Sequence, residues 1–548
     1  MSSAIRVRED HGSLFPAQLP GSSSGRLDSL VVTLIAVGAS CCAAFAFGTQ
    51  IIGHDEGIYV MTAASIREAG EYRLTNLPSQ PLQTKYPPLY PLALAAVLAP
   101  DAPVADQVVR LKLVNAVCLG GSLLLISLLL RRVGLSGPWP LASSLLLLAL
   151  SPGMLAATNW LMAEALFTTL IVAVFVATPQ GETDGVDRQI AVAALLASLT
   201  ALTRSAGTGV CIGLVWHLGR TLGRTRAVIA ALIMLAIVGP WWIWAGVNAN
   251  TTLNPLEHYY VSYERSAWTR LFETPGFALR MLASNALGLA SAVPMVAGFY
   301  TAVTALVGVI LIGVGVFCTR KQQLTRLILS ISCAYTLIAA GHPMNLDRYV
   351  IPLIPALLVM LAAGFSALTT GTSLGARTWS VPVHLAMAAL VAGNALWARR
   401  YVEVSRLGMN AGIGYVQPFE WKGFEEVILW LRTNTPPDSI IASGYDTTYA
   451  AYTGRRGLRP WLHEPETYDP RYGRYLRWSA DADRTARLLS QVNASYLVVD
   501  PYLPDGPGLH ARTMLESLIR QVPRRWELRF TSSDGLHQIY RRADTRDE

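Results

Sequence analysis

Charged residues are scarce in this sequence of 548 residues, where Asp, Glu, Lys and Arg make up 15% of the chain. Soluble globular proteins carry about 25% charged residues. Hydrophobic residues instead make up 52%, and repeated apolar runs approach the roughly 20 residues that a helix needs to cross a bilayer. The formal net charge of +8 does not indicate nucleic-acid binding, because much of it lies in short loops between apolar runs. The composition predicts a polytopic α-helical membrane protein.

Cysteine is also rare, and all six cysteines lie in apolar segments. The polar parts of the chain contain none, which excludes a disulfide framework there. The sequence has no Gly-rich phosphate-binding loop, no CxxC pair and no internal repeat of solenoid length. Only four of the 44 basic residues are lysines, a bias that indicates a GC-rich bacterial genome.

The order of polar and apolar stretches predicts three parts. Residues 1–28, with Gly, Ser and Pro, indicate a disordered cytoplasmic tail. Residues 29–397 contain about eleven apolar runs, counting the stretch interrupted at Arg204 as two short helices. Basic loops such as RRVGLSG and RTLGRTR fall on one side, which is therefore cytoplasmic and puts the loop 53–107 outside. Residues 398–548 are polar, and their amphipathic-helix and buried-strand patterns predict a soluble extracytoplasmic α/β domain in the periplasm.

Acidic residues stand where the chain leaves or enters apolar runs. Asp55 and Glu56 directly follow the first run, and Glu164 opens a later one. The structural alternative for the first pair is capping of a helix that begins near Gly57. For Glu164 the alternative is an ion pair with Arg204. A carboxylate at the membrane edge is costly, however, and indicates function by default.

Cations and a tyrosine lie in the same outer segments. Lys85 stands in TKYPPLYP, Arg204 in TRSAG, and Arg348 and Tyr349 in LDRYVIP. As a structural alternative, Lys85 extends to the lipid headgroups and Arg348 and Tyr349 anchor a helix at the interface. Together, however, these groups suit a phosphate-bearing lipid substrate with a reacting hydroxyl. Cations would neutralise the phosphate, and a carboxylate would accept the hydroxyl proton.

The outer loop NPLEHYYVSYERSAWTRLF is aromatic and basic. It indicates either a mobile lid over the substrates, with His258, Arg265 and Arg270 as contact residues, or an amphipathic interfacial helix.

Five motifs occur in a fixed order: HDEGIYV, KYPPLYPL, LMAEALF, LTRSAG and DRYVIPLIP. This set resembles the integral membrane glycosyltransferases of the C-type fold (GT-C) that use polyprenyl-phosphate sugars. That family includes the protein O-mannosyltransferases and the aminoarabinose and galacturonic acid transferases of lipid A. The resemblance covers roughly residues 29–400.

The resemblance implies an inverting glycosyltransferase in the bacterial cytoplasmic (inner) membrane. It would move a monosaccharide from a polyprenyl-phosphate carrier to a hydroxyl of a lipid, protein or envelope glycan at the outer face. By motif position Asp55 would be the general base, with Glu56 as the competing candidate, and Glu164 would orient a substrate. The donor phosphate would be held by Lys85, Arg204, Tyr349 and Arg348.

Some relatives place an acid beside the lysine of the first loop and bind a divalent metal there, but here that neighbour is Thr84. We therefore predict no obligatory metal or other cofactor, while a divalent metal stays open. Three other functions are considered: a transporter of a lipid-linked or anionic substrate, a membrane-anchored sensor, and an oligosaccharide ligase or polymerase. A transporter should show paired repeats and charges near the midplane of the membrane.

Overall fold

The protein is described by a computed structural model that covers residues 23–543 apart from short segments. The segments outside the description are 52, 100–101, 136, 183, 250–252, 263–266, 343–346, 370–373, 408–410, 413–414, 417–419, 461–467, 470–473, 476–481, 502–506 and 522–524. Most of the predicted tail, residues 1–22, also lies outside it, but its last part from Ser23 onward is helical rather than disordered.

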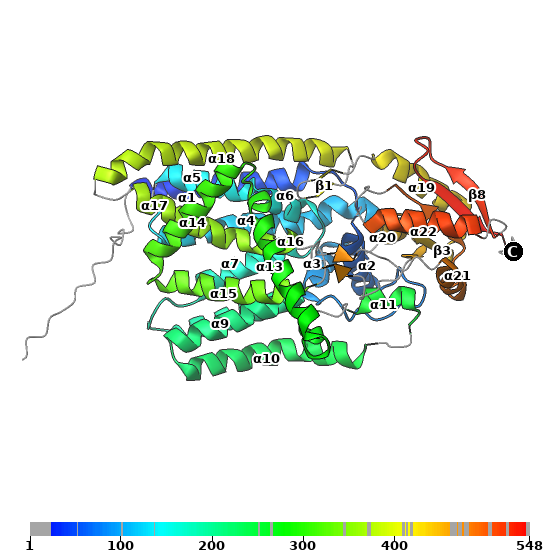
Figure 1. Ribbon diagram of the computed structural model, residues 1–548, viewed down its shortest axis with the longest axis horizontal. Helices are drawn as coiled ribbons and strands as arrows, with labels where there is room; N and C mark the ends of the chain where they lie inside the picture. The colour runs from blue at the N-terminus through cyan, green and yellow to red at the C-terminus, as the bar shows by residue number, and fades with distance from the viewer. Residues whose placement is uncertain are drawn as a thin grey trace, which may run out of the picture.

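A bundle of long helices forms the larger part of the molecule (Figure 1). Its helices are α1 (Ser23–Phe45), α4 (Val108–Arg132), α5 (Pro138–Ala149), α6 (Pro152–Asn159), α7 (Glu164–Ala177), α8 (Val186–Thr203), α9 (Thr208–Thr221), α10 (Arg224–Val247), α14 (Ala302–Thr319), α15 (Gln323–Ala340), α17 (Ile354–Thr369) and α18 (Leu374–Arg406). Their buried faces share one hydrophobic core. Large hydrophobic side chains such as Val117, Val247 and Leu396 are exposed on the outside, as expected for a surface covered by lipid.

The predicted class of multi-pass membrane protein is confirmed, although the set of spans differs in detail. In the described part of the chain, nine helical segments are long and apolar enough to cross a membrane, or ten if the bent pair α5 and α6 forms one span. Two predicted spans, α7 and α9, have only 14 residues each. Helix α13 (Pro275–Ala297), most of which lies in residues 247–293 where no span was predicted, is long and apolar enough. Figure 1 shows α13 running at a steep angle to α7 and α15.

The predicted break at Arg204 is present. Helix α8 ends at Thr203, Arg204 has extended backbone (φ −148, ψ 139), and the 3-10 turn Ser205–Gly207 leads into α9. The extended residue thus separates α8 from α9 at Arg204, whose charged side chain is buried.

A layer of short helices lies between the bundle and the C-terminal domain (Figure 1). It contains α2 (His54–Ala69), α3 (Leu89–Val97), the 3-10 helix Val104–Gln107 and α11 (Pro255–Val261), whereas α12 (Ala267–Glu273) packs against α13. Its apolar residues do not form a separate core. One cluster joins Ile58 and Tyr90 of this layer with Leu458 and Leu497 of the C-terminal domain.

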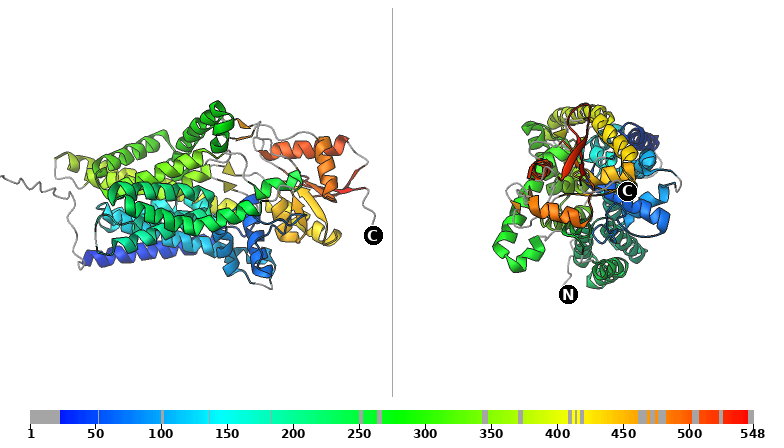
Figure 2. Two further views of the ribbon diagram at one scale, coloured as in Figure 1. Left: turned by 90° about the horizontal axis from the view of Figure 1, so that it is seen from below. Right: turned by 90° about the vertical axis from the view of Figure 1, so that its right-hand side faces the viewer.

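The C-terminal domain is α/β, as predicted, and Figure 2 shows it at one end of the molecule. Its five-stranded sheet has the order β4-β3-β7-β9-β8, with β3 parallel to β4 and β7, and β9 antiparallel to β7 and β8. The strands are β3 (Ile440–Ser443), β4 (Arg456–Leu458), β7 (Tyr496–Val499), β8 (Trp526–Thr531) and β9 (Gln538–Arg542). The helices are α19 (Trp421–Asn434), α20 (Asp446–Thr453), α21 (Ala482–Gln491) and α22 (Pro507–Gln521). Helix α18 continues to Arg406, past the boundary predicted at residue 397.

Candidate active site

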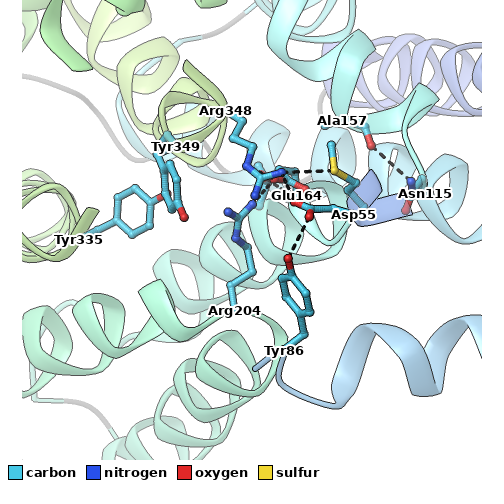
Figure 3. Close-up of polar contacts among 11 residues, drawn as sticks. Asp55, Tyr86, Asn115, Ala157, Glu164, Arg204, Tyr335, Arg348 and Tyr349 are labelled. Carbon is cyan, nitrogen blue, oxygen red and sulfur yellow. Dashed lines mark hydrogen bonds and ion pairs between the residues drawn. The ribbon is translucent and has the colours of Figure 1, made fainter. Parts of the chain in front are cut away.

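Asp55 lies in the first turn of α2, where the helix dipole favours a negative charge. Its Oδ1 accepts a hydrogen bond of 2.9 Å from the Tyr86 hydroxyl. Its Oδ2 accepts a hydrogen bond of 2.6 Å from Nη1 of Arg348 (Figure 3). Arg348 lies nearly 300 positions later in the chain. The Asp55 side chain is 15% exposed. The carboxylate is therefore nearly buried and held by groups from two other segments.

The charges around Asp55 set its protonation state. Burial alone would raise the pKa of the carboxyl, but the Arg348 guanidinium, with a smaller effect from Lys85, lowers the pKa below its ordinary range. Asp55 is therefore ionised at neutral pH. While Arg348 holds it, the carboxylate is also a weak base.

Glu56 has a different environment, although it is the next residue. Its Oε2 accepts from the backbone N–H of the N-cap residue Gly53 at 2.6 Å and so caps the start of α2. Its Oε1 accepts from the Leu161 N–H at 2.8 Å. The structural alternative of capping therefore describes Glu56, which ties α2 to the segment before α7. The geometry favours Asp55 over Glu56 as the reacting carboxylate.

Glu164 connects the remaining charged residues. It begins α7, is buried, and accepts a hydrogen bond from Nη1 of Arg204. Nε of Arg348 lies 3.7 Å from the same carboxylate, so Arg348 lies between Asp55 and Glu164. The guanidinium carbon of Arg204 is 4.8 Å from the centre of the Tyr349 ring. The Glu164–Arg204 ion pair is thus present, and Figure 3 shows it as part of one cluster with Asp55.

Lys85 is buried rather than exposed at the surface, at 7% exposure. Its Nζ donates to the Tyr259 carbonyl at 2.8 Å and lies 3.8 Å from the centre of the Tyr259 ring. The neighbouring Thr84 donates to the Val261 carbonyl at 2.7 Å. These contacts fix the first outer loop to α11. They place the Lys85 charge close enough to contribute to the field at Asp55.

The proposed lid residues are not part of this cluster. His258 is exposed and its Nδ1 lies 2.9 Å from the Ser262 hydroxyl. The Arg270 guanidinium carbon lies 5.1 Å from the centre of the Phe277 ring. Arg265 lies outside the described residues. A role for this loop as a lid stays a prediction.

Sequence reasoning missed several buried polar residues near the site. Tyr86 directly follows Lys85 in its motif, and that adjacency was the available signal. Lys112 donates to the Gly48 carbonyl and, at 2.9 Å, to Oδ1 of Asn159. A lysine within the apolar run of α4 was also a visible signal.

In the part of the chain that the structure describes, no group of three or more His, Cys, Asp or Glu gathers to hold a metal ion. That no metal is obligatory stays a prediction.

The helical bundle, the layer of short outer helices and the terminal α/β domain together define the C-type glycosyltransferase fold, so the fold implied by the five motifs is confirmed. The structure of ArnT from Cupriavidus metallidurans in the apo state matches with a TM-score of 0.57 and 13% identity, over 93% of this chain and 98% of that chain. ArnT from the same organism bound to undecaprenyl phosphate matches with a TM-score of 0.55 and 12% identity, over 95% of this chain and 98% of that chain.

An archaeal protein has the same fold. The oligosaccharyltransferase AglB from Archaeoglobus fulgidus, in complex with an inhibitory peptide and a dolichol-phosphate, matches with a TM-score of 0.57 and 13% identity. The match covers 96% of this chain and 76% of that chain. No protein-family model and no curated protein sequence matches the chain.

Proposed function

We propose that this protein is an inverting glycosyltransferase that moves a monosaccharide from a polyprenyl-phosphate carrier to a hydroxyl group. The acceptor is a lipid, a protein or an envelope glycan at the outer face of the bacterial cytoplasmic membrane. Structures of the same fold that bind undecaprenyl phosphate or dolichol-phosphate support this donor class.

One observation carries the proposal: Arg348 lies between two carboxylates at the end of the bundle that carries the C-terminal domain. Its Nη1 donates to Asp55 and its Nε lies 3.7 Å from Glu164. Arg204 pairs with the same Glu164. A base for a hydroxyl and cations for a phosphate thus meet within one network, although they come from segments far apart in the chain.

In the first step of the proposed mechanism, the donor phosphate binds between the cations Arg348, Arg204 and Lys85. Arginine pairs with phosphate oxygens through several N–H groups, and lysine acts as a point charge. The phosphate competes with Asp55 for Arg348. Binding of the donor therefore weakens the hold on Asp55 and makes its carboxylate a better base.

In the second step, Asp55 accepts the proton of the acceptor hydroxyl while that oxygen attacks the anomeric carbon. The bond from the anomeric carbon to the phosphate oxygen breaks, and the electron pair leaves with the polyprenyl phosphate. This leaving group is a weak base, so cations suffice to stabilise its developing charge. The sugar passes through an oxocarbenium-like state, which a nearby anion such as Glu164 stabilises.

Two observations bear on the alternative functions. The charged cluster lies at one end of the bundle, whereas a transporter is expected to bind its substrate near the midplane. Transfer of an oligosaccharide is the second candidate, because AglB, named as an oligosaccharyltransferase, has the same fold. The identity of the donor distinguishes these two transferase reactions.

The test uses a strain from which the gene is deleted and which is complemented with variants. Its envelope glycans and lipids are compared by mass spectrometry, and purified enzyme is assayed with a panel of undecaprenyl-phosphate monosaccharides and envelope fractions. We expect Asp55→Asn to lower transfer by about 10²–10⁴-fold, the usual contribution of a general base. Glu182→Gln, at an exposed acid paired with Arg226, is the control and should keep transfer. Near-normal transfer by Asp55→Asn would remove Asp55 as the base.

A further inference from the structure

The C-terminal domain makes its contact with the candidate site through α20, which packs against the start of α2 (Figure 1). The packing is close because Gly57 has no side chain: a Cβ there would lie 2.4 Å from Cβ of Thr447. The Thr447 hydroxyl also donates to the His54 carbonyl at 3.1 Å. The helix turn that carries Asp55 is therefore held from the side of the C-terminal domain.

An ion-pair network extends from this contact. Nδ1 of His54 lies 3.0 Å from Oδ1 of Asp446, the first residue of α20. The Tyr260 hydroxyl donates to Oδ2 of the same carboxylate at 2.7 Å, and Nε of Arg459 lies 3.6 Å from Oδ1. Asp446 is fully buried. Three parts of the chain, namely the first outer loop, α11 and the C-terminal domain, thus meet around one carboxylate.

The network determines the tautomer of His54. Burial and the charge of Arg459 lower the pKa of the imidazole, while Asp446 and Asp55 oppose this effect, so the ring is neutral. A neutral ring beside a carboxylate carries its proton on Nδ1, which donates to Asp446. The Nε2 atom then keeps its lone pair and points away from Asp446.

This Nε2 atom is one of several buried side-chain atoms that lack a hydrogen-bond partner among the described residues, and it is the one in the turn that carries Asp55. It is buried, the His54 side chain is 7% exposed, and Nε2 has no hydrogen-bond partner among the described residues. Buried acceptors are nearly always paired, and one left unpaired is costly. The ring packs against Tyr259, 5.7 Å between centroids, and Lys85 lies over the same tyrosine ring. The unpaired acceptor therefore lies among the residues of the candidate donor site.

We propose that Asp446 is a positioning residue which, through Nδ1 of His54, holds Nε2 ready to accept a hydrogen bond from a substrate hydroxyl beside Asp55. This inference rests on the proposed function, because sugars and their acceptors supply that hydroxyl. The C-terminal domain then completes the site rather than serving only as an attached module. The hydroxyl belongs either to the sugar of the donor or to the acceptor.

Two substitutions separate this role from a purely structural one. His54→Asn keeps an N–H donor near the position of Nδ1 but removes Nε2, so the bond to Asp446 is retained and the acceptor is lost. Asp446→Asn keeps the shape but removes the charge that fixes the tautomer. The matched control is Asp500→Asn, because Asp500 is another fully buried aspartate of the same domain that pairs with a histidine, His537, at 3.0 Å.

We expect His54→Asn and Asp446→Asn to lower transfer by about 10–100-fold, the loss that follows when a residue that orients a metal-bound histidine is replaced. Binding of undecaprenyl phosphate, used as a probe, should change little, since the phosphate cations are untouched. A rise in the KM for the donor sugar would assign the hydroxyl to the sugar, and a rise in the KM for the acceptor would assign it to the acceptor. Asp500→Asn should lower stability only.

A double-mutant cycle gives the decisive readout. If His54 acts on the reaction that Asp55 catalyses, adding His54→Asn to Asp55→Asn should cost much less than in the parent enzyme. If His54→Asn only disturbed the fold, the fold-losses in transfer caused by the two substitutions would instead multiply. The inference is overturned if Asp55→Asn abolishes transfer while His54→Asn and Asp446→Asn behave like Asp500→Asn. If Asp55→Asn itself keeps transfer, the proposed function fails instead.

Discussion

At the scale of single residues, neighbouring acids have different roles. The sequence identified Asp55 and Glu56 as a pair but did not separate them, since both suit the first turn of a helix. Their roles differ because of their partners. Glu56 meets backbone N–H groups, one of them more than a hundred residues away, whereas Asp55 meets the side chains of Tyr86 and Arg348. Such long-range partners depend on tertiary structure, which local patterns do not specify.

The first prediction concerns Glu56. Glu56→Gln weakens the bonds to the N–H groups of Gly53 and Leu161, because an amide has a single acceptor oxygen and no charge. Hydrogen bonds to charged groups contribute about 1.5–3 kcal/mol, so a loss of stability of about that size is expected. Transfer per folded molecule should stay within a few-fold of the parent. Thermal unfolding in detergent and activity per folded protein measure the two quantities. A loss as deep as that of Asp55→Asn, with unchanged stability, would make Glu56 the base.

The second prediction concerns the pH dependence set by Arg348. Burial raises the pKa of Asp55, and Arg348 is the strongest group that lowers it. Because the folded-state pKa is depressed, Asp55 keeps its charge as the pH falls through the ordinary carboxylate range. In Arg348→Gln only weaker charges oppose the effect of burial on the pKa of Asp55, so this pKa should rise. The acidic limb of the kcat/KM profile should therefore move to higher pH.

Arg348→Lys is the control for this shift. It keeps a positive charge beside Asp55, so its acidic limb should stay at low pH even if donor binding weakens through loss of the second contact with Glu164. Profiles of transfer against pH, measured for the parent and both variants, give the comparison. Identical limbs in all three proteins would show that Asp55 does not govern the acidic limb.

At the scale of elements, apolar patterns predicted most helices but not their exact roles as spans. The break at Arg204 was visible because a charge interrupts an apolar run. No span was predicted for most of α13, whose apolar sequence contains Arg280 and Asn285. In the structure, Asn285 is buried and donates to the carbonyls of Ala340 and His342. Its polarity is thus satisfied by the end of α15, a contact that the sequence of α13 alone does not indicate.

The third prediction concerns the joint between α4 and its neighbours. Lys112 donates to the Gly48 carbonyl, which follows α1, and to Asn159 at the end of α6. Lys112→Met removes this donor from both acceptors and leaves Oδ1 of Asn159 with the Ser405 hydroxyl at 3.4 Å, and a buried acceptor left unpaired costs about 1–3 kcal/mol. A marked drop in thermal stability is therefore expected. Arg110→Met, at an exposed basic residue of the same helix, should change stability by less than about 0.5 kcal/mol. Equal effects of the two substitutions would mean that the bonds of Lys112 contribute little.

At the scale of the whole molecule, the C-terminal domain and the outer helices share one hydrophobic core. The sequence predicted the α/β character of the domain from an amphipathic helix and buried strands. It did not predict that the domain would contact α2, because Asp446 and Thr447 show no distinguishing local pattern. The chain order also hid the fact that residues of the first outer loop and of α20 lie side by side (Figure 1).

The orientation of the whole molecule in the membrane leads to the last prediction. Basic residues such as Arg131, Arg132 and Arg224 lie at helix ends away from the C-terminal domain, and the positive-inside rule predicts that these ends are cytoplasmic. In a background without the native cysteines, Arg529→Cys on β8 should react with a membrane-impermeant maleimide in spheroplasts. Glu182→Cys, in the loop between α7 and α8, should react only after the membrane is permeabilised. Both positions are exposed, so access through the membrane decides the result. The reverse pattern would place Asp55 and the cations at the cytoplasmic face and would reject transfer at the outer face.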